Sequence, residues 1–335
     1  MYFISTVIKD ENGLLCGCVV INKFIINSGI CDVLAVDDTV GVCKLDYPME
    51  CIVCKDGNGK MQLVGFGYLL NKSQDGFQLF FETFKELSLK ERIKASNNDN
   101  FGNIFVCDRS KPQSNALTTV FPNSKIIYCK WHLLKDIERY CSVKSKIYKF
   151  CFKMLEYRTK YYENKFESVL EGLEDSNFKT LLMNDKEYYI PSEVDKYYHR
   201  NLLTSSLAES CFSILKRRIN WKKETITLGI ECMMNISMSL LIKSINIKIE
   251  IPYVFENRVN KMIGEVAITH LNKEFIQLLR VKKDEICNCK FNITKLPCRH
   301  WLVRNPTGKI EIPSEYLRFN CNLLSSSKKN NLILL

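Results

Sequence analysis

The chain has 335 residues, of which 46% are hydrophobic and 25% are charged, a composition typical of a globular protein with a sizeable core. No stretch reaches the roughly 18 to 20 uninterrupted apolar residues of a membrane span, and Lys9 comes too early for a secretory signal peptide. We therefore expect a soluble intracellular protein without a membrane partner.

The net charge of +11 is concentrated near the C-terminal end of the chain. Residues 281–335 contain six more basic than acidic residues, which is over half of the whole excess. A basic module of this kind favours a polyanionic partner, most simply nucleic acid, although a solvated charged face gives the same count.

Sixteen cysteines are scattered along the chain, several inside apolar runs such as "LLCGCVVI" at 14–21. In such runs cysteine behaves as a small hydrophobic residue, so we expect most thiols to be reduced and buried. Only close groups of cysteine with histidine are candidates for metal binding.

The first 130 residues alternate between strand-like and helix-like patterns. We predict a strand at 31–38, a β-hairpin formed by 49–56 and 61–70 around the turn "DGNGK", and a helix over about 75–90. The helix is indicated by apolar residues at helical spacing. These residues are Phe77, Phe80, Phe81, Phe84 and Leu87.

Further along, the pattern predicts a strand at 103–108, a helix to about 120 and a strand at 125–129. From residue 131 to about 248 it is helical, with a break at "YYIPSEVD". Strands separated by helices favour parallel crossovers, whereas a hairpin is antiparallel, so the fold class is α/β with a mixed sheet.

Carboxylates end two of the predicted strands. Asp37 lies at the end of the first and Asp108 at the end of the strand that begins at 103. Ligands of α/β sheets bind outside the carboxyl ends of the strands, and Mg²⁺ takes oxygen ligands, so two such aspartates would suit a divalent cation. Each aspartate is also explained as a cap of the following turn.

A third carboxylate, Glu209, lies in "LTSSLAESCFSILKRR" at 203–218, after serines that are candidates for the N-cap of a helix. The apolar stripe of this helix comprises Ala208, Cys211, Phe212, Leu215 and Ile219. Glu209 is either a catalytic residue or a first-turn acid that is favoured by the helix dipole.

The stretch "CNCKFNITKLPCRH" at 287–300 contains four zinc-type ligands in two pairs, each pair separated by one residue. They are Cys287, Cys289, Cys298 and His300. Four such ligands suit a closed tetrahedral site, so we predict one structural zinc ion, with chance placement in a cysteine-rich chain as the alternative.

Basic and aromatic residues lie among and after these ligands, where they would hold phosphates and stack on bases. They are Lys290, Lys295, Arg299, Trp301 and Arg304. Contact with a partner protein is the competing role. Lys216, Arg217 and Arg218 are further candidates for DNA binding, and whether "LKRRINWKK" acts as a nuclear import signal is left open.

Several stretches, taken in order, resemble the core of Mutator-like element (MULE) transposases and of proteins domesticated from them. They are "LAVDDT", "YPM", "VCD", "VFPNSKIIYCKWHLLKDI", "LAESCFSILKRR" and "CNC…CRH". The fourth is the most specific, because it contains Cys-x-x-His at Cys129 and His132. The last is similar to the SWIM zinc-finger pattern. The resemblance extends over essentially the whole chain.

The resemblance implies an Asp-Asp-Glu triad at Asp37, Asp108 and Glu209, since the family pattern of Asp, any residue, Thr selects Asp37 rather than Asp38. It also implies a ribonuclease-H-like mixed sheet with an all-helical insertion and a small C-terminal SWIM module. Two Mg²⁺ or Mn²⁺ ions roughly 3.5–4 Å apart would then serve phosphodiester cleavage and joining.

Cys129 and His132 are expected to belong to the active region. Half of a zinc site is one explanation, although no second pair of ligands is obvious nearby in the sequence. A packed thiol with a hydrogen-bonded histidine at a strand-to-helix junction is the other. His132 would orient either a DNA phosphate or a metal-binding carboxylate.

The expected organisation has five parts. They are a first part of the transposase core (1–130), a helical insertion (131–200), a helical completion of the core (201–275), the SWIM module (276–310) and a tail (311–335). Relatives usually carry a separate DNA-binding domain ahead of the core, and here the chain starts almost at the first strand. There are three explanations for this start. The chain is a fragment, a truncated gene copy, or a protein that binds DNA through its insertion and SWIM regions.

The resemblance leads to two candidate functions. The first is a metal-dependent DNA transposase acting in the nucleus on the ends of an element and on target DNA. The second is a domesticated, non-catalytic DNA-binding or transcription-regulatory protein, similar to the far-red-response factors. A homodimer and a protein partner held by the SWIM module stay open.

Overall fold

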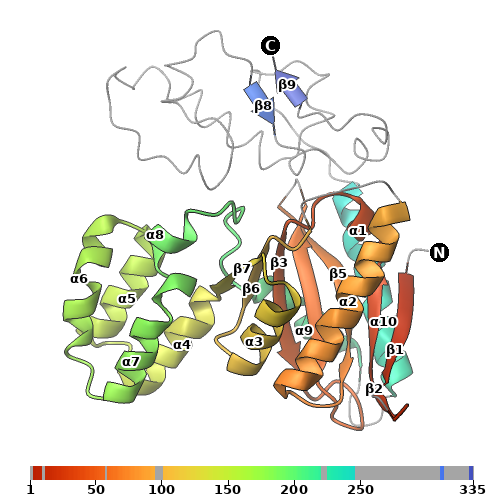
Figure 1. Cartoon of the computed structure of the whole chain (residues 1–335), viewed down its shortest axis with the longest axis horizontal. Helices are drawn as coiled ribbons and strands as arrows, with labels where there is room; N and C mark the ends of the chain where they lie inside the picture. The colour runs from red at the N-terminus through yellow and green to blue at the C-terminus, as the bar shows by residue number, and fades with distance from the viewer. Residues whose placement is uncertain are drawn as a thin grey trace.

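The computed structural model describes residues 3–9, 12–56, 59–94, 101–219 and 225–245, and the backbone of two short strands at 310–312 and 332–334. Figure 1 shows a twisted sheet with helices on both sides and a group of helices beside its β7 edge. None of the helices with described placement is long and apolar enough to cross a membrane.

The main sheet has the strand order β1-β2-β5-β4-β3-β6-β7. Its members are β1 (Phe3–Lys9), β2 (Leu15–Asn22), β3 (Val33–Thr39), β4 (Met49–Lys55), β5 (Met61–Leu69), β6 (Ile104–Cys107) and β7 (Lys125–Tyr128). Neighbours from β1 to β3 pair antiparallel, whereas β6 pairs parallel to both β3 and β7. The mixed α/β sheet is confirmed, and its arrangement is consistent with a ribonuclease-H-like core.

Two strands at the sheet edge were not predicted. Strands β1 and β2 form an antiparallel hairpin that joins the predicted sheet through β5. Their sequences, "FISTVIK" and "LCGCVVIN", mix apolar residues with lysine, glycine and small polar residues, so their period is weak. The local pattern does not specify these strands, and pairing of β2 with β5 is what adds them to the sheet.

The helices fall into three groups by their place around the sheet (Figure 1). They are α1 (Lys23–Asn27), α2 (Gln74–Lys94) and α3 (Lys111–Val120); then α4 (Lys130–Tyr140), α5 (Lys146–Tyr157), α6 (Lys160–Leu170), α7 (Ser176–Asn184) and α8 (Pro191–Val194); then α9 (Ser206–Arg218) and α10 (Ile226–Ile245). The predicted break at "YYIPSEVD" contains the end of a 3-10 turn (Lys186–Tyr188) and the short α8. A short antiparallel pair, β8 (Ile310–Ile312) with β9 (Leu332–Leu334), stands apart from the main sheet.

The two faces of the sheet have separate hydrophobic cores. Successive strand residues point to opposite faces, so Leu34 and Val36 pack with α1–α3, whereas Val33 and Ala35 pack with α9 and α10. We call these the α2 face and the α9 face. On the α2 face lies the phenylalanine stripe of α2, whose helix is confirmed with slightly longer bounds.

This alternation assigns the polar residues at the end of β3 to opposite faces. Asp37 continues the series of Val33 and Ala35 on the α9 face, and Asp38 follows Leu34 and Val36 on the α2 face. The adjacent aspartates therefore have different surroundings. In the described segments the cysteine thiols are free and most are buried.

Candidate active site

Three strand and helix ends bring the predicted carboxylates to one edge of the sheet. Strands β3 and β6 are parallel, with Ala35 opposite Val106, so Asp37 and Asp108 lie at the same edge, two residues further along each chain. Asp37 is 7% exposed. Glu209 comes from the first turn of α9, which contacts both β3 and β4.

The sequence builds this arrangement through packing that is independent of the carboxylates. Helix α9 is held on the α9 face by four buried side chains on one stripe, as its period predicts. They are Ala208, Cys211, Phe212 and Leu215. Because Glu209 follows directly after the first of these, docking of the stripe fixes the direction in which the carboxylate leaves the helix.

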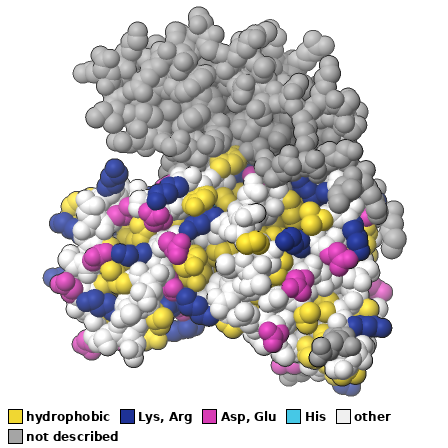
Figure 2. Space-filling model, in the orientation of Figure 1, with side chains coloured by type: hydrophobic (Ala, Val, Ile, Leu, Met, Phe, Trp, Pro, Cys, Tyr) yellow, Lys and Arg dark blue, Asp and Glu magenta, His cyan; other side chains and the backbone are white. Residues whose placement is uncertain are grey.

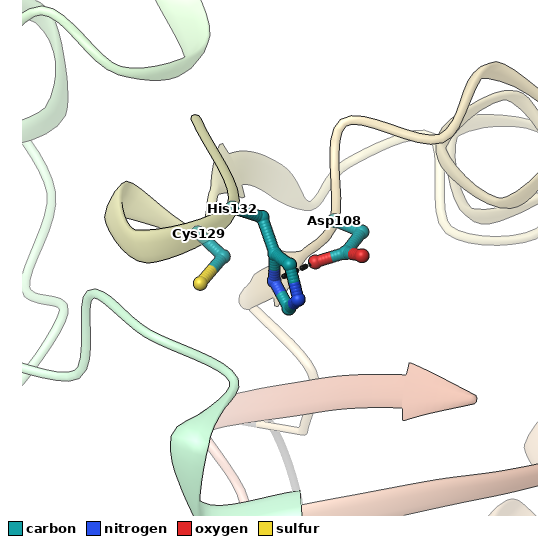
Figure 3. A group of neighbouring side chains, drawn as sticks. All are labelled: Asp108, Cys129 and His132. Atoms are coloured by element: carbon teal, nitrogen blue, oxygen red, sulfur yellow. Dashed lines mark ion pairs between the residues drawn. The ribbon is translucent and has the colours of Figure 1, made fainter. Parts of the chain in front are cut away.

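The ring of His132 connects two of the carboxylates. Its Nδ1 forms an ion pair with Asp108 Oδ1, and its Nε2 lies 3.5 Å from Glu209 Oε1. Figure 3 shows the ring, from α4, between the Cys129 thiol and the Asp108 carboxylate. Two acids from separate elements therefore share one basic side chain.

The pKa of Asp37 reflects its burial and the charges of the neighbouring side chains. Burial raises the pKa of this carboxyl to about 8, and the negative charge of Asp108 adds to the effect. His132 acts in the opposite direction, while Asp38 and Glu209 contribute smaller increases in the pKa. The cluster therefore holds more negative charge than its own side chains balance, which favours a bound cation.

His132 is the cation that the chain itself supplies. Burial lowers its pKa, but hydrogen bonds with Asp108 and Cys129 outweigh burial and raise the pKa to about 10. The imidazole is thus protonated at neutral pH when no metal is bound, and its charge lies between Asp108 and Glu209.

Cys129 and His132 also hold the start of the helix that carries Glu209. Ser205 is the N-cap residue of α9, but its hydroxyl makes no capping bond to its own helix. The hydroxyl lies 3.2 Å from His132 Nδ1 instead, and the Ser205 N–H donates to Cys129 Sγ at 3.3 Å. The Cys-x-x-His motif thus contacts both the N–H and the hydroxyl of the residue at which α9 begins.

The donor atoms at this edge fit two kinds of metal. Three carboxylates offer the oxygen ligands that Mg²⁺ and Mn²⁺ prefer, and Glu209 Oε1 is buried without a hydrogen bond from any described residue. Asp108, Cys129 and His132 also bring ligand atoms within 4.8 Å of one another. Thiolate and imidazole favour zinc or a similar ion, and Asp108 is common to both sets.

A second pair of acids lies across the sheet from this site. Asp38 pairs in register with Glu50 of β4, and both follow the α2 face. Lys72 forms an ion pair with Asp38, and Gln113 of α3 donates to Glu50 at 2.9 Å. Glu50 was not identified from the sequence as a neighbour of Asp38, because only the register of β3 and β4 reveals it.

One basic candidate reaches the edge of the site. Lys216 Nζ donates to Thr39 Oγ1 at 2.7 Å, next to the end of β3, while Arg217 and Arg218 are exposed in the last turn of α9. On the face shown in Figure 2, basic and acidic side chains are interspersed over the helices beside the sheet. That face carries mixed charge.

The predicted C-terminal ligands and nucleic-acid contacts lie outside the described residues. They are the zinc ligands Cys287, Cys289, Cys298 and His300, and the basic or aromatic residues Lys290, Lys295, Arg299, Trp301 and Arg304. Their roles stay predictions from spacing and resemblance.

Residues 33–136 match the family model of the MULE transposase domain. The match begins at β3 and ends within α4, so it includes Asp37, Asp108, Cys129 and His132 but not Glu209. It covers less than half of the chain, and over this span the resemblance is confirmed. None of the curated proteins matches the chain.

Proposed function

Because the chain carries a MULE transposase domain, we propose that it is a DNA transposase that cuts and joins phosphodiesters at Asp37, Asp108 and Glu209. The strongest support is the convergence of three acids from β3, β6 and α9 at one sheet edge. The third acid lies outside the matched span, yet it faces the same histidine as Asp108.

The three carboxylates would hold two Mg²⁺ or Mn²⁺ ions. When bound, such ions activate an attacking water or 3′-hydroxyl and stabilise the leaving oxygen of an in-line displacement. The chain's own task is to fix the acids and to position the strands, so it needs no nucleophilic side chain. Burial of Asp37 and packing of α9 on the sheet provide that rigidity.

His132 would act as a positioning residue in this site. Its protonated ring compensates part of the charge of Asp108 and Glu209 before metal binds. Through Ser205, the same ring is connected to the N-terminus of α9. We infer that His132 orients metal-binding carboxylates rather than a DNA phosphate.

DNA would approach along the edge where Lys216 lies beside Thr39, with Arg217 and Arg218 following on α9. Basic side chains here would contact phosphates and set the register of the strand without reading sequence. Element ends and target DNA are the proposed substrates, and the nucleus is the proposed compartment.

The C-terminal motif is proposed as a structural zinc module, with Cys287, Cys289, Cys298 and His300 as ligands. One zinc ion per purified chain is expected, and a Cys298→Ser variant should lose it. A chain that contains zinc in neither form would remove this module from the proposal.

Metal-dependent cleavage of DNA tests the function. Wild type should nick supercoiled plasmid with Mg²⁺ or Mn²⁺ and not with EDTA, and Asp108→Asn and Glu209→Gln should each lower the rate about 10²-fold or more. Glu138→Gln is the matched control, because Glu138 lies on α4 like His132 but pairs with Lys135.

Two outcomes would contradict the transposase. Equal nicking by wild type, Asp108→Asn and Glu209→Gln would identify a contaminating nuclease. DNA binding without cleavage under either metal would favour the non-catalytic DNA-binding alternative, in which the acids keep only their structural contacts.

A further inference from the structure

A cavity of about 370 Å³ lies beside the carboxylate cluster, between α4, α5 and the start of α9. Its apolar wall is formed by Trp131, Leu134, Phe152 and Leu155, and Glu209 lines its other side. This volume is near the lower end of the roughly 300–1,000 Å³ range of small-ligand pockets. It suits one planar ring system and is too small for a base pair with its backbone.

The aromatic wall is exposed at an energetic cost. Trp131 is 46% exposed and Phe152 is 45% exposed, although Leu134 and Leu155 of the same wall are buried. Large aromatic surfaces of this kind favour contact with another flat apolar face. Trp131 is also oriented by its neighbours, since its ring packs edge-on against His132 at 4.6 Å and lies 5.7 Å from Lys135 Nζ.

The cavity borders the candidate active site. Glu209 belongs to both, and the His132 ring that contacts Trp131 also contacts Asp108. A group in the cavity is therefore next to whatever is held at the carboxylates. If a phosphodiester lies there, the nearest flat group of the same molecule is the base of an adjoining nucleotide.

The rim of the cavity carries a cation that a DNA strand would meet. Lys130 Nζ donates to Glu156 at 2.6 Å, and this ion pair joins α4 to α5 where both residues line the cavity. Both side chains are partly exposed, so the pair exchanges easily with solvent ions. A phosphate would replace Glu156 as the partner of Lys130.

We propose that this cavity receives a single unstacked base of the DNA strand that lies across the carboxylates, with Trp131 and Phe152 as its stacking surface. The inference rests on the proposed function and identifies its substrate as DNA with a base displaced from the helix. Stacking on aromatic side chains compensates for the loss of stacking within the DNA. The free-energy cost of displacing a base is smallest where the base is already unpaired.

Binding of a bubble duplex, without added divalent ions, tests the pocket. Anisotropy would compare a labelled duplex that contains a three-base mismatch with the same duplex fully paired, with no added Mg²⁺ or Mn²⁺ and no chelator, so that a structural zinc ion is retained. Wild type should prefer the bubble, and Trp131→Ala or Phe152→Ala should lower that preference about 5- to 150-fold, while affinity for paired DNA is unchanged.

Two further variants separate stacking from other effects. Trp131→Phe should retain most of the preference, because a flat ring remains. Tyr161→Ala is the matched control, since Tyr161 is 58% exposed on α6 but does not line the cavity. A 2-aminopurine in the bubble should be quenched by wild type and not by Trp131→Ala.

The outcomes distinguish this inference from the proposed function. If wild type does not prefer the bubble, or if Trp131→Ala and Phe152→Ala both keep the preference, the base pocket is wrong, whatever the cleavage result. If wild type never cleaves DNA but shows the aromatic-dependent preference, the transposase fails and the pocket stands as a site for unpaired DNA. Unchanged affinity for paired DNA shows that a variant has folded.

Discussion

Asp37 and Asp38 are neighbours in the chain and yet face two different regions of the molecule. Asp37 lies on the α9 face with Asp108, Glu209 and the His132 ring. Asp38 lies on the α2 face, where it pairs with Lys72 and stands opposite Glu50. One step along a strand thus separates an acid in an incompletely balanced cluster from an acid with its own lysine.

The comparison shows that local composition does not decide what a carboxylate does. Each face holds a buried acid, Asp37 or Glu50, and each holds a basic partner for a neighbouring acid. On the α9 face the acids converge from three elements onto one histidine beside a cavity, whereas on the α2 face they are enclosed by α3 and its Gln113. Acids that converge beside an accessible cavity are better placed to contact a substrate than acids that are enclosed by a helix.

The largest expected effect separates the two aspartates directly. Asp37→Asn should lower metal-dependent DNA cleavage by about 10²-fold or more, because it removes one of the three carboxylates proposed to bind metal. Asp38→Asn should stay within about threefold of wild type, because that side chain follows the opposite face. Nicking rates of supercoiled plasmid, with equal folding by circular dichroism, measure both. The reverse order of the two rates would exchange their roles.

The next effect is on stability and belongs to the α2 face. Burial, with the charges of Asp38 and Asp37, raises the pKa of Glu50 well above its usual range. Glu50→Gln keeps the shape and removes the buried acid, so it should raise the free energy of unfolding at pH 8 by about 1–3 kcal/mol. Urea unfolding monitored by circular dichroism would measure the difference.

The pH dependence gives this prediction its sign. A raised folded-state pKa means that Glu50 costs little below its unfolded pKa of about 4.3 and destabilises the fold progressively as pH rises toward the folded value. The stability gained by Glu50→Gln should therefore be larger at pH 8 than at pH 5. A constant or decreasing gain over this interval would mean that Glu50 is ionised in the folded chain.

A smaller effect on stability is expected at the anchor of α9. Cys129→Ala should lower the free energy of unfolding by about 1–2 kcal/mol, because the buried Ser205 N–H loses its acceptor. Cys107→Ala is the control, since Cys107 is equally buried on the neighbouring strand but packs on the α2 face. Cleavage activity at a temperature where both variants are folded should fall further in Cys129→Ala, through displacement of Glu209.

The smallest effect compares the lysines of the two faces. Lys216→Ala should weaken DNA binding about two- to fivefold and reduce the slope of log K against log salt by about 1, as for one lost phosphate contact. Lys72→Ala should leave that slope unchanged, because its charge is paired with Asp38. Titrations at several salt concentrations would show whether only the α9 face meets DNA.

Elements with a strong local period could be predicted from the sequence. The phenylalanine stripe of α2 specifies one buried face, and the turn "DGNGK" joins the apolar runs of β4 and β5; both the helix and the hairpin were found. The edge strands β1 and β2 could not be recognised in this way, because their stability comes from pairing with β5 and packing under α2 rather than from a pattern of their own.

The site was harder to predict than the fold. Asp37 and Asp108 could be singled out as acids at strand ends, but Glu209 was indistinguishable from a first-turn acid without the family resemblance. The serines before Glu209 were candidates for the N-cap of α9. Ser205 is the N-cap residue, but its hydroxyl lies near His132 and makes no capping bond to the helix. Contacts of this kind depend on which elements meet in space, and spacing along the chain does not contain them.

Helix α9 has a consequence for how the molecule forms. Its four buried side chains cover part of one side of the sheet, which α10 also covers, and its first turn contains the last acid, about a hundred residues after Asp108. Long-range contacts of this kind form late in folding. A nascent chain released before α9 would expose the apolar face of β3 and β4 to chaperones and proteases. We expect such an incomplete copy to be degraded before it could catalyse any reaction.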